Sequence, residues 1–443
     1  MNAEVRPIKT AAETALAQSF AAVKRALPGA GAVGALREDA FRRFETEGLP
    51  HRRVEEWKYT DLRALMRDAK PLAAVPDAAA KARAKDALAM LAAIEARRVV
   101  FVDGALVPEL SDLSSLEAGL TIRSMAQALA AGDGDLIAHL GRIVPTDDVA
   151  VALNTAFMGD GAVIHVAQGV ALAQPIHLVF VNAGGEPASV FARSLVVIEK
   201  GARAMLVESH IGSTASEDQV NTVLELKVGD EVHVDHIKIT GAGAGALHVS
   251  TLIAAIGAHA RFNEFLFTTG GAVVRNQVFV RFDGEGTIAG IRGASLLKGR
   301  QHADTTLVAD HAAADCTSRE VFKSVLDEEG RSVFQGKIIV RRHAQKTDAK
   351  MATHALLLSE TAEADNKPEL EIFADDVQCG HGATAGALDE ELKFYLMARG
   401  IPAAEAEAML VQAFLGEAID GIEHAGLREA LIENVAAWLG ARG

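Results

Sequence analysis

The sequence predicts a mainly β protein, built as a β-solenoid with helical regions at both ends. From about residue 150 to residue 380 the chain is a series of short strand-like segments with alternating apolar residues, for example 222–228, 231–239 and 274–282. No long helical pattern interrupts the series, which argues against alternating strands and helices. So long a run of strands exceeds one sandwich, whereas a solenoid grows coil by coil, with two or three short strands in each. Stacked sandwiches are the alternative.

The first 97 residues are predicted to form an N-terminal helical domain. Three segments carry apolar residues at helical spacing: 10–27, 37–50 and 81–98. The stretch 51–66 combines many charges with Trp57 and Tyr59. Thr60 is predicted to cap the helix that follows it.

The middle of the chain is predicted to lead into the β-body and then form it. Asp103-Gly104 in 99–110 is typical of a hairpin turn between two strands. We assign 98–149 to a transition segment and 150–385 to the β-helix core. Open solenoid ends invite aggregation, so the helical regions are expected to cover both ends.

The last region, 386–443, is predicted to be a C-terminal helical domain. Asp389 is a suitable N-cap for a helix in 388–400, and Pro402 suits the first turn of the next helix. A third helix over 427–440 repeats apolar residues at helical spacing. These helices could form a cap on the β-body or a docking surface for a partner.

Composition and charge exclude several classes of function. The chain has 443 residues and a net charge of −15, which disfavours binding to nucleic acid because that needs a surplus of Lys and Arg. Two cysteines cannot build a disulfide framework. The N-terminal sequence lacks the pattern of a secretory signal, and no apolar run is long enough for a membrane helix. We therefore expect a reducing, cytoplasmic setting without membrane contact.

Cys379 and His381 are the candidate site residues, two positions apart in the segment DDVQCGHGAT. If 370–381 is one extended strand, Val377, Cys379 and His381 project from one face. Thiolate and imidazole are ligands that suit iron, iron–sulfur clusters, zinc or copper. Two ligands cannot complete a metal site, so others would have to come from elsewhere or from a partner. The alternative is that Cys379 is a small buried apolar residue and His381 a turn residue.

A second group of polar residues lies in 302–321. It contains two histidines, three aspartates and a cysteine: His302, Asp304, Asp310, His311, Asp315 and Cys316. The two histidines are nine residues apart, which fits no standard zinc spacing. We expect these side chains to face solvent at coil corners rather than to bind metal.

Two further segments carry no chemistry in our interpretation. The Gly-rich segment 241–247 lacks the Lys-Ser/Thr ending of a phosphate-binding loop, and it is predicted to be a turn. The carboxylates of Glu55 and Glu56 are expected to lie on a solvated face. A cysteine hydrolase is disfavoured as well, because no Gly-rich oxyanion motif precedes Cys379.

Three segments resemble the SufB/SufD family of the SUF iron–sulfur cluster assembly machinery. They are RRVEEWKYTDL at 52–62, the stretch 332–359, and the long motif at 367–402 that contains Cys379 and His381. The Trp-Lys-Tyr-Thr sequence and the chain length favour the SufD branch of the family. The resemblance covers most of the chain.

The resemblance implies a fold, a role and partners. The family fold is a right-handed parallel β-helix flanked by helical N- and C-terminal domains. The role is that of a non-catalytic scaffold, which pairs with a SufB-like subunit and binds the SufC ATPase through its C-terminal helices, here 388–440. His381 would be a metal ligand for a transient iron–sulfur cluster shared with the partner, with Cys379 beside it. Gly380 stands where the family often has Ser, which adds backbone freedom.

Three other functions remain open from the sequence. A SufB-like scaffold acting as a homodimer would need no second kind of subunit. A carbohydrate-active β-helix enzyme would need carboxylates along one groove of the solenoid, and usually export. A purely structural solenoid would show no dependence on metal.

Overall fold

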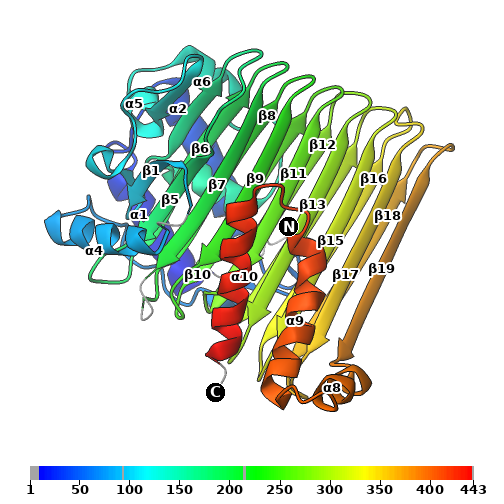
Figure 1. Cartoon of the computed structure of the whole chain (residues 1–443). Coiled ribbons are helices and arrows are strands. Elements are labelled where there is room, and N and C mark those ends of the chain that lie inside the picture. Colours follow the sequence, from blue (N-terminus) through cyan, green and yellow to red (C-terminus); the bar gives the residue numbers. More distant parts are fainter. Residues whose placement is uncertain (1–8, 92–93, 213–215, 442–443) are drawn as a thin grey trace, which may run out of the picture.

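The computed structural model describes residues 9–91, 94–212 and 216–441, and its centre is a two-sheet parallel β-solenoid. Each full coil contributes one strand to sheet A and one to sheet B (Figure 1). Sheet A has nine strands: β3 (Leu120–Ser124), β4 (Ala162–Val166), β6 (Ser189–Ile198), β8 (Gln219–Val228), β10 (Leu247–Ile256), β12 (Val273–Phe282), β14 (His302–His311), β16 (Arg331–Val340) and β18 (Glu363–Ile372). The predicted solenoid is confirmed, with two strands in each coil.

Sheet B has ten strands: β2 (Ala105–Leu106), β1 (Arg97–Val102), β5 (Ile176–Asn182), β7 (Arg203–Gly212), β9 (His233–Gly241), β11 (Arg261–Thr268), β13 (Ile288–Leu297), β15 (Thr317–Leu326), β17 (Asp348–Leu357) and β19 (Gln378–Ala387). Arg203 lies opposite His233 and Asp348 opposite Gln378, so a coil takes about 30 residues. The turn predicted at Asp103-Gly104 joins β1 to β2, and both residues have positive φ.

Alternation along the strands places one set of side chains inside the solenoid and the other on its two outer faces. Val234, Phe262 and Leu307 belong to the interior cluster and are almost fully buried. A slip of one residue would turn these side chains outward, so the apolar pattern fixes the register. The regular register then stacks equivalent positions of successive coils into rows.

The N-terminal helices pack on both outer faces of the first coils. They are α1 (Ala11–Val23), α2 (Ala32–Glu47), α3 (Leu62–Leu65) and α4 (Ala78–Leu88), with short 3-10 turns η1 (Glu55–Trp57) and η2 (Ala89–Leu91). Phe20 of α1 stacks on Phe41 of α2, and both belong to a cluster that contains Val249 of sheet A. Ala84 of α4 packs with Val179 of sheet B.

Four short elements follow β2 before the regular coils: η3 (Pro108–Leu110), α5 (Met125–Ala130), α6 (Gly134–His139) and α7 (Val149–Phe157). Every residue of α7 is buried, and Phe157 at its end stacks on Phe191 of β6. No helix in the described part of the chain is both long and apolar enough to cross a membrane.

The C-terminal helices do not cover the end of the solenoid, so that expectation is wrong. They are α8 (Glu390–Met397), α9 (Ala403–Ile419) and α10 (Ala425–Gly440). Figure 1 shows α9 and α10 folded back across the outer face of sheet B. The reason is apolar complementarity: Val411 and Leu415 of α9 pack with outward-facing residues such as Phe265 and Phe267 of β11. The last coil, β18 and β19, is left uncovered.

Three local predictions are also corrected. Asp61, not Thr60, caps α3, because the Asp61 carboxylate accepts the Ala64 N–H. The segment 370–381 is not one strand, since β18 ends at Ile372 and β19 begins at Gln378. The helix predicted over 81–98 is shorter: η2 ends at Leu91, positions 92–93 lie outside the described residues, and β1 begins at Arg97. The predicted turn 241–247 joins β9 to β10 as expected.

Candidate functional site

The last coil ends in two strand edges that pair with nothing in the described chain. β18 pairs only with β16, and β19 pairs only with β17. The Gln378 N–H donates to the Thr347 carbonyl at 2.8 Å, so alternate residues of β19, starting with Cys379, turn their N–H groups to the free edge. Unpaired backbone groups in a row are a template for another strand. This end of the solenoid is therefore an edge that can accept one.

Cys379 and His381 lie on one face of β19, as predicted for an extended strand. Their register partners on β17 are Ala349 and Met351, both buried in the interior cluster. Cys379 and His381 thus occupy the inward-facing rows at the open end, where Cys379 is half-buried against the core and His381 is exposed. Among the described residues, no third His, Cys, Asp or Glu joins them in a metal-ligand group. Cys379 and His381 are therefore the two candidate ligands at this end of the described chain.

The surroundings of Cys379 disfavour the thiolate form of its side chain. Burial raises its pKa above the ordinary value, and the carboxylates of Asp348 and Glu320 add to the increase. A nucleophilic cysteine needs the opposite shift. The raised pKa therefore argues against a free nucleophile, whereas a bound metal ion would lower the pKa of the thiol and so could still use it as a ligand.

Glu320 is a functional candidate that the sequence analysis missed. It lies on β15 in the same inward row as Met351 and His381, and its residue surface is fully buried. Neither carboxylate oxygen has a hydrogen bond of normal length. Burial raises the pKa of Glu320 to about 7, against the lowering effect of the Ser318 hydroxyl. The sequence held one signal: in β15, Ser318, Glu320 and Phe322 form the inward series, so an acid stands where an apolar residue is expected.

Replacing Glu320 by Gln is expected to raise stability at high pH. Below pH 4.5 the carboxyl is protonated in both the folded and the unfolded chain. Between pH 4.5 and about 7 the Glu320 carboxyl ionises in the unfolded chain but not in the folded chain. The free energy of unfolding of the native protein therefore falls as the pH rises through this range, and it becomes constant above about pH 7. The Gln variant has no such loss and should exceed the native chain by up to about 3 kcal/mol at pH 8. Denaturant unfolding at pH 4.5 and 8 measures it, and equal differences at both pH values would contradict it.

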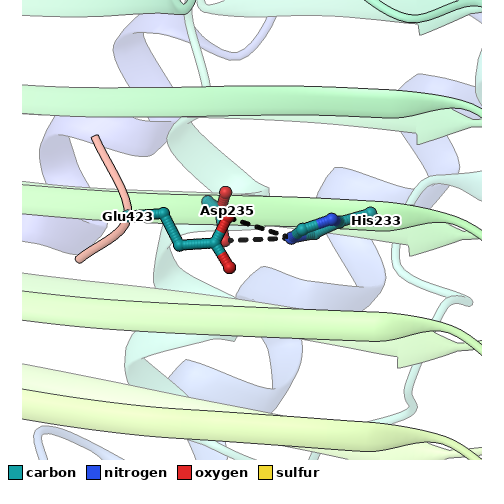
Figure 2. A group of neighbouring side chains, drawn as sticks. All are labelled: His233, Asp235 and Glu423. Carbon is teal, nitrogen blue, oxygen red and sulfur yellow. Dashed lines mark ion pairs between the residues drawn. The ribbon is translucent and has the colours of Figure 1, made fainter. Parts of the chain in front are cut away.

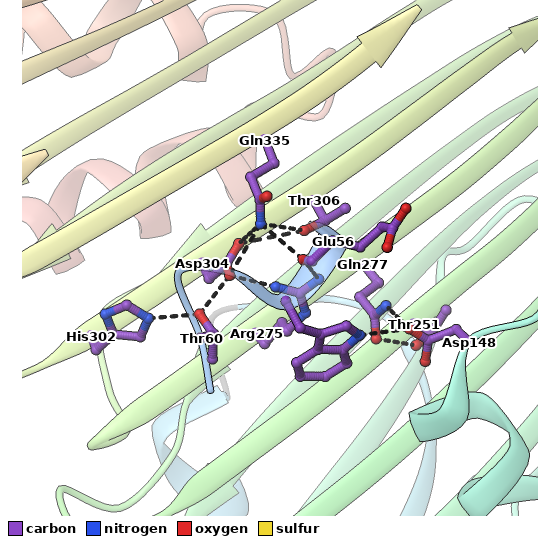
Figure 3. A network of polar contacts seen from close by, with 11 residues as sticks. Glu56, Thr60, Asp148, Thr251, Arg275, Gln277, His302, Asp304, Thr306 and Gln335 are labelled. Carbon is purple, nitrogen blue, oxygen red and sulfur yellow. Dashed lines mark hydrogen bonds and ion pairs between the residues drawn. The ribbon is translucent and has the colours of Figure 1, made fainter. Parts of the chain in front are cut away.

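The segment 52–62 lies across the outer face of sheet A and is anchored by a buried ion pair. Arg275 of β12 pairs with Asp304 of β14, and both side chains are fully buried. The Arg275 guanidinium lies 3.9 Å from the centre of the Trp57 ring and donates to the Glu56 carbonyl at 2.7 Å. Thr60 donates to Asp304 at 2.5 Å, and Figure 3 shows these groups converging. The segment therefore holds its place through charge and ring contacts with the solenoid.

Further contacts extend this anchor along sheet A. The Trp57 indole N–H donates to Asp148 at 3.0 Å, and Gln277 donates to the same carboxylate at 2.8 Å. Lys367 of β18 pairs with Glu55 at 2.5 Å, so the segment reaches the last coil. The side chains of Glu55 and Glu56 are exposed, as expected.

The group predicted in 302–321 does not assemble into a metal site among the described residues. His302 makes a 2.8 Å hydrogen bond with Thr60, and burial lowers its pKa. His311 is buried, with its ring stacked on Phe282. Cys316 is buried in the interior cluster. The expectation that the side chains of this group face solvent is therefore wrong for His302, His311 and Cys316.

The two other aspartates of the group lie at the surface or close to it. Asp310 pairs with Arg341 at 2.8 Å. Asp315 has a positive φ of 58°, which is typical of a turn residue. A hollow of about 440 Å³ lies near Asp310 and Arg341, between sheet A and the segment around Trp57, but neither Cys379 nor His381 lines it.

The solenoid interior holds a second set of buried charges, far from the open end in sequence. His236 of β9 lies 2.7 Å from the Glu264 carboxylate and 3.7 Å from that of Glu208. Burial alone would lower the pKa of His236, but the two carboxylates raise it to about 10. Burial lowers the pKa of Lys238 to about 8. Two acids and two bases balance one another, which is how a core tolerates ions.

These features define a class of protein: a parallel β-solenoid with helices packed on its outer faces, which exposes two strand edges and a cysteine–histidine pair at one end. The model described as "SUF system FeS cluster assembly, SufBD core domain" matches residues 180–414, and the "SufBD protein N-terminal region" matches residues 13–178. The chain belongs to the SufBD family, and its role is in iron–sulfur cluster assembly.

Curated relatives agree with this family. An iron–sulfur cluster assembly SufBD family protein of Synechocystis is 32% identical over 88% of this chain and 87% of its own length. The iron–sulfur cluster assembly protein SufD of Escherichia coli is 32% identical over 89% of this chain and 91% of its own. SufD of Bacillus subtilis is 27% identical over 63% of this chain. The resemblance in the end motifs is confirmed, and the carbohydrate-active alternative is left without support.

Proposed function

We propose that this chain is a non-catalytic scaffold subunit that supplies half of a transient iron–sulfur cluster site. One observation carries the proposal: His381 and Cys379 stand together on the free edge strand β19 of an uncovered coil. A cluster needs about four ligands, and this chain offers two there. The other ligands would come from a partner, and the cluster is cargo that the complex builds and passes on.

His381 is the proposed metal ligand and Cys379 its neighbour in the site. The exposed imidazole is accessible to iron without any rearrangement of the core. The half-buried thiol of Cys379 must lose its proton to bind iron, which the metal itself promotes. Glu320, buried behind them with a pKa of about 7, is a local group able to hold that proton.

The partner at the open coil is proposed to be a SufB-like subunit. Two terminal strands of a related solenoid, one for each sheet, would continue both sheets and bury the free edges of β18 and β19. A second copy of this chain has the same edges, so a homodimer is the alternative when the paralogue is absent.

The C-terminal helices are proposed to bind the SufC ATPase. No residue of α8 is buried, and the exposed fraction of the Phe394 side chain and backbone together is 72%. Leu392, Tyr395 and Met397 of the same helix are exposed as well. These four large apolar residues, exposed within two turns of one helix, leave apolar surface that a protein partner would bury.

Co-expression with a SufB-like subunit and its ATPase, followed by affinity capture of this chain, tests the proposal. We expect both proteins to be captured, and Phe394→Glu to lose the ATPase while keeping the SufB-like subunit. Glu429→Gln, on the exposed face of α10, is the matched control and should lose neither. Capture of neither partner by the native chain would reject the proposal.

A further inference from the structure

A group of three polar side chains lies far from β19, beneath the turn between α9 and α10. His233 and Asp235 project from the beginning of β9 on the outer face of sheet B, and Glu423 lies in the turn. Figure 2 shows the three side chains directed toward one another. Their ligand atoms all lie within 4.8 Å of one another. Two elements far apart in the sequence, β9 and the turn between α9 and α10, thus bring a nitrogen and two carboxylates together.

The distances do not suit hydrogen bonds. The His233 Nε2 atom is 3.7 Å from an Asp235 oxygen and 4.0 Å from a Glu423 oxygen, and it is buried without a hydrogen-bond partner. Around a divalent first-row ion with bonds of about 2.0 to 2.2 Å, neighbouring donor atoms lie roughly 3 to 4 Å apart. The two distances from His233 lie at the upper end of that range, so a small inward movement of the side chains would let the three groups share a cation.

The surroundings support a ligand role for these groups. Asn263 of β11 donates to the Asp235 carboxylate at 2.7 Å, which fixes the orientation of that carboxylate as an outer group does in metal sites. The Arg203 guanidinium lies 3.5 Å from the Glu423 carboxylate. Because the Arg203 side chain is exposed, it can move away when a cation binds. A cavity of about 270 Å³, lined by Asp235, Glu423 and His424 among others, adjoins the group and has room for water ligands.

We propose that His233, Asp235 and Glu423 bind one divalent first-row transition-metal ion. One imidazole and two carboxylates suit Zn²⁺, Fe²⁺ or Mn²⁺ better than a soft ion such as Cu⁺. Because Glu423 belongs to the turn between α9 and α10, the ion fastens the C-terminal helices to β9. The site does not depend on Cys379 or His381.

Zinc titration of the chelator-treated full chain tests the proposal. The titrations use the Cys379→Ala/His381→Ala variant, so that metal bound at the open coil does not contribute. We expect one Zn²⁺ per chain by calorimetry. Adding His233→Ala or Glu423→Gln should weaken binding at least tenfold, whereas adding Glu429→Gln, an exposed acid of α10, should leave the affinity unchanged. No Zn²⁺ binding in the parent variant, or equal affinity after His233→Ala, would overturn the proposal.

Hydrogen exchange provides a second measurement, because an ion bound nonspecifically at the surface would not change the amide exchange rates in this turn. Zn²⁺ should slow amide exchange over 420–427 in the parent variant and have no effect there after Glu423→Gln. Equal slowing with and without Glu423 would also overturn the proposal. Both experiments use the variant that lacks Cys379 and His381. Their results therefore do not depend on whether the native chain supports cluster assembly.

Discussion

Arg275→Ala is expected to destabilise the chain by about 3 to 5 kcal/mol, because it leaves the Asp304 carboxylate buried without its partner. The same change removes the guanidinium from the face of Trp57 and from the Glu56 carbonyl. The segment 52–62 should therefore detach from sheet A before the solenoid unfolds. Thermal unfolding and limited proteolysis of the N-terminal region measure the two effects.

Arg281→Ala on the same strand is the control. Arg281 pairs with Asp283 at the surface, with side chains that are 31% and 41% exposed, so its loss should cost less than about 1 kcal/mol. Arg275→Met combined with Asp304→Leu should recover part of the stability, since no charge is then buried alone. Equal stability of the two single variants would show that Arg275 is not the anchor.

Ala383→Pro is expected to weaken pairing with the proposed SufB-like partner strongly while the chain still folds. The Gln378 N–H points to β17, so the N–H of Ala383, five residues later, points to the free edge. Proline removes that donor and leaves the hydrogen bonds between β17 and β19 in place. A partner carbonyl left buried without a donor costs about 1 to 3 kcal/mol, a loss of roughly tenfold to a hundredfold in affinity.

Ala383→Val is the matched variant, since it keeps the N–H and suits a strand. It should be captured with the SufB-like subunit as well as the native chain is. Circular dichroism and thermal unfolding of the isolated Pro variant report whether the fold is intact. Unchanged capture of the partner by a folded Ala383→Pro chain would contradict pairing through the edge of β19.

Much of the fold could be predicted because its signals are local. Alternating apolar residues in 231–239 became β9, and Asp389 caps α8 as expected. The position of α9 and α10 could not be predicted, because it depends on outward-facing residues of β11 such as Phe265, which look identical to inward-facing ones in the sequence. Local patterns give elements, whereas packing partners depend on the register of distant coils.

One residue in the sequence, Pro368, is a signal for the open end of the solenoid. Pro368 lies within β18, and the Glu363 N–H donates to Gly330 of the preceding coil at 3.1 Å. Pro368, five residues later, therefore has its missing N–H on the free edge, which is where strands tolerate proline. The pair Cys379 and His381 was found from the motif, but Glu320 was not, since only the register places it behind them.

The buried polar network of sheet A was beyond prediction as well. Thr60 is a reasonable helix cap in sequence, yet it bonds to Asp304, more than 200 residues away, at 2.5 Å. The same holds for Arg275, whose partners come from two distant segments, β14 and 52–62. Charges that are paired across such distances look like solvated residues until the fold joins them.

The most direct test of the shared-site account is the iron and sulfide content of the anaerobically assembled complex with the SufB-like subunit and the ATPase. The complex with the native chain should show the visible absorbance of an iron–sulfur cluster. His381→Ala should leave the complex intact and lower its cluster content severalfold, because the imidazole is exposed at the end of the solenoid and is the proposed iron ligand. A fully assembled His381→Ala complex with the native content of iron and sulfide would contradict the account.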